Sequence, residues 1–143
     1  MAFRASNQSL QDVLVQIKRT AFVIKRDAAA LRADSETTAT PFARIQEFFR
    51  SLKARREAMT ATAATPGLAA YAKGQENDQS YDVVAEFNAM KAAIVATEDW
   101  IVINMPPTIA VSSSAADIVL AEFAPASLAG LRTQLIALIA AID

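Results

Sequence analysis

Apolar residues recur along the N-terminal third of the chain at alternating spacings of three and four, which is the spacing of one face of an α-helix. The residues of this seam are Leu10, Leu14, Ile17, Ala21, Ile24, Ala28 and Leu31. Ser9 can cap the first turn, and Asp34-Ser35 can end the helix. The pattern therefore predicts a first helix over about residues 9–33.

Three further segments carry one apolar seam each and predict three further helices. Thr40-Pro41 supplies a cap and a first-turn proline for a helix over about residues 41–60. A third helix, over about residues 80–104, stops before two prolines, and a fourth covers residues 125–142. Their seam residues are Phe42, Ile45, Phe49, Leu52 and Met59 in the second helix, Val83, Phe87, Met90, Ile94, Thr97 and Ile101 in the third, and Leu128, Leu131, Leu135, Leu138 and Ile142 in the fourth.

Residues 108–123 break this helical period. Two short β-branched runs, Ile109 to Val111 and Ile118 to Leu120, stand on either side of three serines. Such a pattern predicts a short β-hairpin or an extended arm between the third and fourth helices, and it leaves both open. The sequence as a whole predicts one all-α domain over residues 1–143, an antiparallel four-helix bundle with this insertion.

The residue types exclude several kinds of chemistry. The chain of 143 residues has no His and no Cys, which removes His-dependent triads, thiolate nucleophiles and zinc sites of the usual kind. Its three glycines cannot form a phosphate-binding loop. We therefore predict a protein that is not an enzyme, with no catalytic residues, cofactor, metal or small-molecule substrate. We also expect no secretory signal and no membrane span, because the apolar stretches are shorter than about 20 residues.

Charge is divided unequally along the chain. The formal net charge is -1. Residues 1–60 hold eleven basic and six acidic side chains, a balance of +5, and residues 61–143 hold three basic and nine acidic ones, a balance of -6. This split predicts that the two halves face each other, either within one bundle or between copies.

The second predicted helix carries a basic run of Arg44, Arg50, Lys53, Arg55 and Arg56. Basic side chains with phenylalanines among them can bind phosphates and stack on bases. Phe49 lies on the seam and Phe48 lies beside it. We therefore favour the interpretation that both rings belong to the core and that the basic side chains face solvent or a partner. A small nucleic-acid-binding or regulatory protein is the alternative.

On the first predicted helix, Lys18 and Lys25 are seven residues apart, and Val15 and Phe22 form a second apolar line of the same period that continues to Ala29. A second apolar line on the same helix is more apolar surface than a lone four-helix bundle buries. This surface therefore indicates a neighbouring subunit. The other interpretation, weighed equally, is that Phe22 covers an edge of its own bundle.

Glu98 and Asp99 lie near the end of the third predicted helix, where negative charge opposes the helix macrodipole. We therefore expect a cation from the first two helices close by, within the subunit or across an interface. Adjacent helix positions point about 100° apart, so this pair is poorly placed for acid–base catalysis. Trp100 follows as a partly buried anchor, with an interface hot spot as the alternative.

Glu98 to Pro106, then the β-like insertion, then Leu128 to Ile139, resemble small helical proteins encoded by tailed bacteriophages and prophages. The likeness covers about a third of the chain and brings no catalytic or ligand motif; unlike the family pattern, the insertion here is short and serine-rich, without turn glycines. It implies a structural component of a virion, at the neck, head–tail connector or tail.

The leading hypothesis is therefore a non-enzymatic virion protein that forms a ring or multimer with copies of itself and contacts other virion proteins. It would be found in the virion, and in the host cytoplasm during assembly. The candidate interface residues are Val15, Lys18, Phe22, Lys25, Arg44, Arg50, Lys53, Arg55, Arg56, Glu98, Asp99 and Trp100.

Overall fold

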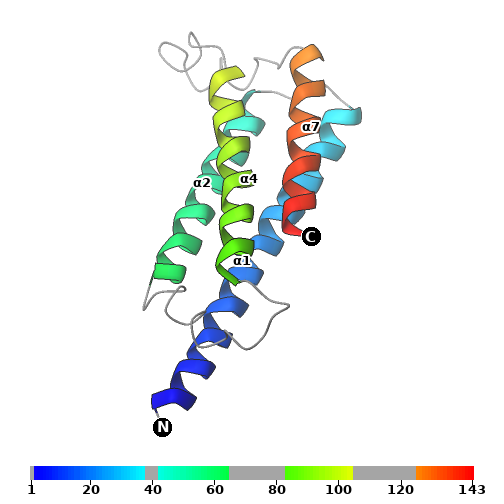
Figure 1. The fold of residues 1–143 in the computed structure, drawn as a ribbon. Coiled ribbons are helices and arrows are strands. Elements are labelled where there is room, and N and C mark those ends of the chain that lie inside the picture. The colour runs from blue at the N-terminus through cyan, green and yellow to red at the C-terminus, as the bar shows by residue number, and fades with distance from the viewer. Residues whose placement is uncertain (1, 38–41, 65–82, 105–124) are drawn as a thin grey trace.

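A computed structural model of the chain describes residues 2–37, 42–64, 83–104 and 125–143. All of the secondary structure in these residues is helical (Figure 1). The helices are α1 (Ala2–Thr37), α2 (Phe42–Ala64), α4 (Val83–Asn104) and α7 (Pro125–Ile142). The all-helical prediction is thus confirmed for this part of the chain, and the predicted hairpin or arm at 108–123 lies outside the described residues.

The four helices run alternately up and down and form a closed bundle (Figure 1). α1 packs against α2 and α7, and α4 packs against the same two helices. Each helix therefore has two antiparallel neighbours, as in an up-down-up-down four-helix bundle.

The predicted seams supply the core of this bundle. Ile24, Leu31, Ile45, Leu52, Ile94, Ile101, Leu131, Leu135 and Leu138 are at most 2% exposed. On α2 the seam is shifted slightly from the predicted one, because Phe48 is buried and Phe49 is only partly buried against the core. Thr97 is buried with its hydroxyl donating to the Ala93 carbonyl at 2.9 Å, so a polar seam residue is accommodated without an unsatisfied hydrogen-bond donor.

Three of the predicted helix ends lie further out in the structure. α1 begins at Ala2, ahead of the predicted cap Ser9, and continues through Asp34-Ser35 to Thr37. No Gly or Pro interrupts residues 2–37, so neither polar position forces the helix to stop. α2 likewise continues past residue 60 to Ala64, whereas the ends of α7 agree with the prediction.

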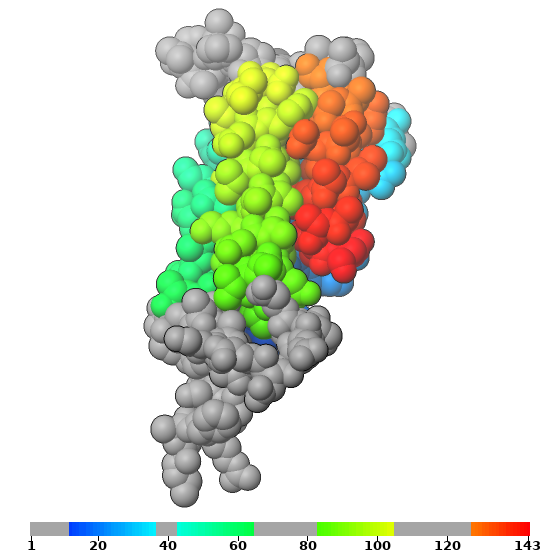
Figure 2. Space-filling model, viewed as in Figure 1, coloured from blue at the N-terminus to red at the C-terminus, as the bar shows by residue number. Residues whose placement is uncertain are grey.

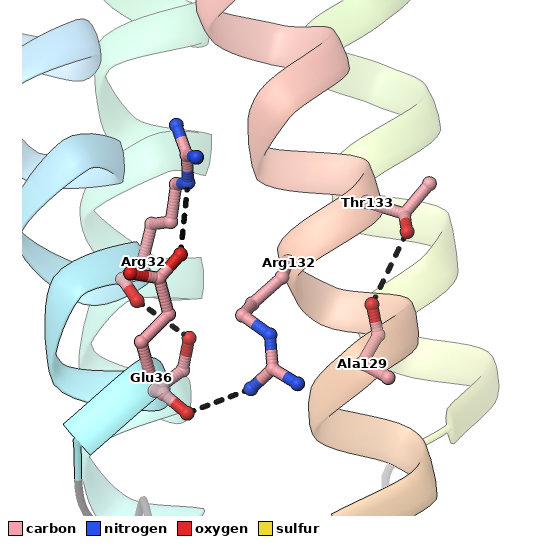
Figure 3. A network of polar contacts seen from close by, with 6 residues as sticks. Arg32, Glu36, Ala129, Arg132 and Thr133 are labelled. Atoms are coloured by element: carbon pink, nitrogen blue, oxygen red, sulfur yellow. Dashed lines mark hydrogen bonds and ion pairs between the residues drawn. The ribbon is translucent and has the colours of Figure 1, made fainter.

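The C-terminal end of α1 is bound by a side chain from α7 (Figure 3). Arg132 donates from Nη1 to the Ser35 carbonyl at 2.7 Å, and the Ser35 hydroxyl donates to the Arg32 carbonyl at 2.7 Å. Arg32 in turn pairs with Glu36 at 3.3 Å. Carbonyls in the last turn of a helix lack helical partners and carry partial negative charge, so the guanidinium both caps α1 and joins it to α7.

Replacing Arg132 with methionine should lower the free energy of unfolding by about 1 kcal/mol, the usual worth of a capping or charged hydrogen bond of this kind. Methionine keeps an unbranched apolar stem and lacks the guanidinium, so the loss reports mainly the polar contact. Urea unfolding followed by circular dichroism measures it. Thr133→Met, on the exposed side of α7, is the matched control and should change stability by less than about 0.5 kcal/mol; equal losses in the two variants would contradict the capping role.

The helices of the bundle differ in length. α1 has 36 residues and α7 has 18. α1 therefore extends past the other three helices at its N-terminal end, and α7 stops near the middle of α1 (Figure 1). In the space-filling view, the end of α7 lies short of the start of α4, its neighbour on this face (Figure 2).

Candidate functional site

The second apolar line of α1 lies on the surface. Val15 is 42% exposed and Phe22 is 63% exposed. Lys18, Arg19 and Arg26 are exposed beside them. The sequence prediction that this line lies outside the core is confirmed, and a large aromatic ring flanked by cations faces solvent.

The cations along this surface differ in what they bind. Lys25 pairs with Asp143 at the end of α7. Arg26 has only its neighbour Asp27, at 3.8 Å. Within the described part of the chain, Lys18 and Arg19 form neither an ion pair nor a side-chain hydrogen bond. Lys18 therefore has no ion-pair partner among the described residues, whereas Lys25 joins the basic half of the chain to the acidic half.

A groove of about 560 Å³ lies between α1, the beginning of α4 and the end of α7. Its apolar lining comes from Leu14, Ile17, Ala21, Phe22, Val83, Phe87, Ala89, Met90, Ala141 and Ile142. Charged side chains also line it, Lys18 and Lys25 from α1, Glu86 from α4 and Asp143 from α7. Two of the candidate interface cations therefore belong to one apolar depression, which the sequence alone did not show.

The basic run of α2 is largely used within the chain. Arg44 donates from Nε and Nη2 to Asp34 at 3.1 and 3.0 Å. Arg55 donates to the Ser51 hydroxyl at 3.2 Å and lies 3.9 Å from Asp27. Arg56 pairs with Glu98 of α4. Three of the five cations therefore form ion pairs with carboxylates of the same bundle. Arg50 and Lys53 are the two that remain exposed.

Arg56 and Glu98 form a two-pronged ion pair between α2 and α4. Nε lies 2.5 Å from Oε2 and Nη2 lies 3.1 Å from Oε1. The Glu98 side chain is 8% exposed and that of Arg56 is 22% exposed. The hydrogen bonds to Glu98 are the main cause that raises the pKa of Arg56 above its usual value, and the charge of Glu57 and Asp99 adds to it. The expected cation for Glu98 is confirmed, and it comes from within the same chain.

Trp100 is half-buried against the core, as predicted, and its ring lies over Gly130 of α7. A Cβ at Gly130 would lie 2.7 Å from Cζ2 of the indole. Carbon atoms pack at about 3.5–4.0 Å, so glycine at this position is what allows α4 and α7 to approach around the ring. No pattern in the sequence predicted this contact.

Within residues 2–37, 42–64, 83–104 and 125–143, no group of three acidic side chains is placed to hold a metal ion. No helix among them is long and apolar enough to span a membrane. No protein-family model matches the chain, and neither a curated protein nor a solved structure shows a match to it.

Proposed function

We propose that the chain is a non-enzymatic structural subunit that acts through contacts between copies of itself, as a component of a bacteriophage particle. The observation that carries the first part is Phe22, an aromatic ring 63% exposed beside Lys18, a cation without an intramolecular partner in the described residues. Burying such a ring against a partner contributes about 1.5–3 kcal/mol. The bacteriophage assignment rests on the resemblance carried by Glu98 to Pro106 and Leu128 to Ile139.

The rest of the charge distribution is consistent with a partner of the same kind. Lys25–Asp143 and Arg56–Glu98 join the two oppositely charged halves inside one chain. Lys18 and Arg19 on one side, and Glu86 and Asp99 on the other, are exposed and have no ion pair among the described residues. In a dimer, these basic side chains of one copy can pair with these acidic side chains of the other, which favours self-association.

Nucleic-acid binding is the weaker alternative. It requires phosphate contacts from Arg44, Arg50, Lys53, Arg55 and Arg56, but three of these cations already bind carboxylates. Breaking those pairs would subtract from any binding energy that phosphates supply.

Replacing Phe22 with serine should weaken self-association at least about tenfold, which corresponds to about 1.4 kcal/mol. Mass in solution, measured by light scattering over a range of protein and salt concentrations, checks this. The wild-type chain should exceed the monomer mass and should lose mass as salt rises, because part of the contact is between charges. Ile136→Ser, at an exposed apolar position of α7 that is 47% exposed, is the matched control and should behave as wild type.

A wild-type chain that remains a monomer at every concentration and salt would contradict the multimer. The particle assignment has its own test, mass spectrometry of purified particles from the phage or prophage that encodes the chain. Absence of the protein from those particles would overturn that assignment while leaving self-association intact.

A further inference from the structure

The groove lies beside the end of α7, between α1 and the beginning of α4. α7 lies beside α1 and α4 in the upper part of the bundle and ends near the middle of α1 (Figure 1). Its last residues, Ala141 and Ile142, line the groove. On α1 it follows the helix from Leu14 to Lys25, about 18 Å at 1.5 Å per residue. Among the described residues, none occupies the position between α1 and α4 beyond the end of α7.

The N-terminal part of α1 has the length for that place. The segment from Ala2 to Asp12, which we call the overhang, is helical and projects past the other three helices (Figure 1). It is about as long as the part of α1 that lines the groove. In the sequence, Phe3 and Leu10 are seven residues apart and continue the seven-residue spacing of Ile17 and Ile24, both of which are buried in the core. Apolar spacing of this kind is typical of a helix that packs in a bundle.

We propose that the overhang of a second copy of this chain occupies the groove, and that the two copies exchange overhangs reciprocally. The inference rests on the proposed function and names its contact surface. Each overhang would add a helix beside α1 and α4 of the partner, beyond the end of the partner's α7. An exchange of this kind is isologous and closes as a two-fold dimer.

The direction of the inserted helix follows from its neighbours. To keep every neighbour antiparallel, it must run in the same direction as α7, opposite to α1 and α4 (Figure 1). Its N-terminal end then meets the C-terminal end of α7. The partial positive charge of one helix end faces the partial negative charge of the other, which favours this orientation over the reverse.

The two-fold axis then passes between the overhang and the groove-lining part of α1, close to Leu14. The two copies of α1 lie side by side in opposite directions around this point. Lys18 and Phe22, which line the groove on α1, come to lie against the inserted helix of the partner. The exposed ring and the unpaired cation thereby gain a neighbour.

Placing arginine at Ala89 tests the proposal without disturbing the core. Ala89 lines the groove and is exposed in the single chain, so Ala89→Arg should fold normally but block the inserted helix. We expect the dimer dissociation constant to rise at least about tenfold, measured by sedimentation or light scattering. Ala96→Arg, an exposed position on the same helix that does not line the groove, is the matched control and should leave the dimer unchanged.

The chain has no cysteine, so a single introduced cysteine can form a disulfide only with the same residue of a second copy. Leu14→Cys should form a disulfide-linked dimer on mild oxidation, since that bond needs Cα atoms within about 7 Å of each other. Ala137→Cys, on the exposed side of α7, should remain a monomer under the same conditions.

The outcomes separate this proposal from the proposed function. If Phe22→Ser weakens association but Ala89→Arg does not, and Leu14→Cys does not cross-link, the copies meet through the exposed side of Phe22 without a helix in the groove, and the exchange is overturned while self-association stands. If wild type is a monomer throughout, self-association itself is overturned. If Ala89→Arg and Ala96→Arg weaken the dimer equally, the groove is not the contact.

Discussion

Replacing Arg56 with methionine should lower the free energy of unfolding by about 3 kcal/mol. The variant leaves the Glu98 carboxylate, 8% exposed, without its guanidinium. Removing one partner of a buried ion pair is expensive because the other charge stays desolvated, typically 3–5 kcal/mol for full burial. Glu57 and Asp99 also lie close enough to act on Arg56, so three acidic groups would lose their common cation. Urea unfolding followed by circular dichroism measures this change in the free energy of unfolding.

The asymmetry of the pair provides the control. Glu98→Gln leaves behind Arg56, which at 22% exposure keeps more contact with water, and the amide retains one hydrogen-bond acceptor. Its expected cost is about 1 kcal/mol. The double variant Arg56→Met with Glu98→Leu should recover most of the loss, because two apolar groups replace two charges. A loss in the Glu98→Gln variant as large as that in Arg56→Met would contradict this account.

Gly130→Ala should destabilise the protein by about 1–2 kcal/mol, although alanine is the better helix former by about 1 kcal/mol. The added methyl group would lie 2.7 Å from Cζ2 of Trp100, and overpacking of a tight contact costs about 1–3 kcal/mol. The clash therefore outweighs the gain in helix propensity. Thermal unfolding followed by circular dichroism measures the difference.

The sign of this effect should reverse when the ring is made smaller. Phenylalanine at position 100 lacks the fused six-membered ring to which Cζ2 belongs, so Gly130→Ala in a Trp100→Phe background should be neutral or stabilising by up to about 1 kcal/mol relative to Trp100→Phe alone. If alanine destabilises both backgrounds by the same amount, contact with the indole is not the reason for glycine at this position.

The number of helices and most of the core could be predicted from periodicity alone. Four seams at three-and-four spacing correspond to the four described helices, because burying one face of each is what a bundle requires. Helix ends were predicted less well. Ser9 is a good cap in isolation, but α1 continues through it, since a polar residue permits a helix end without imposing one.

The candidate site was predictable only in part. Exposure of Val15 and Phe22 followed from their position off the seam, and a cation for Glu98 followed from the helix macrodipole. The identity of that cation did not, because Arg56 is 42 positions away and the register between α2 and α4 decides which arginine reaches the carboxylate. The groove also needed the fold, since it arises from the unequal lengths of α1 and α7 and from no local motif.

The contacts between α1 and α7 join residues that are far apart in the sequence, so forming them has a large cost in loop-closure entropy. Arg132 and Ser35 are separated by 97 positions, and Lys25 and Asp143 by 118, whereas α1 meets α2 across a short connection. Bringing distant segments together costs more chain entropy than forming a local hairpin, and interfaces between distant segments slow folding. α7 supplies three of the most deeply buried leucines, so the burial that completes the core is tied to the helix that follows the other three along the chain. Until α7 docks, the apolar faces of α1 and α4 lack their shared neighbour along the part of the bundle that α7 covers.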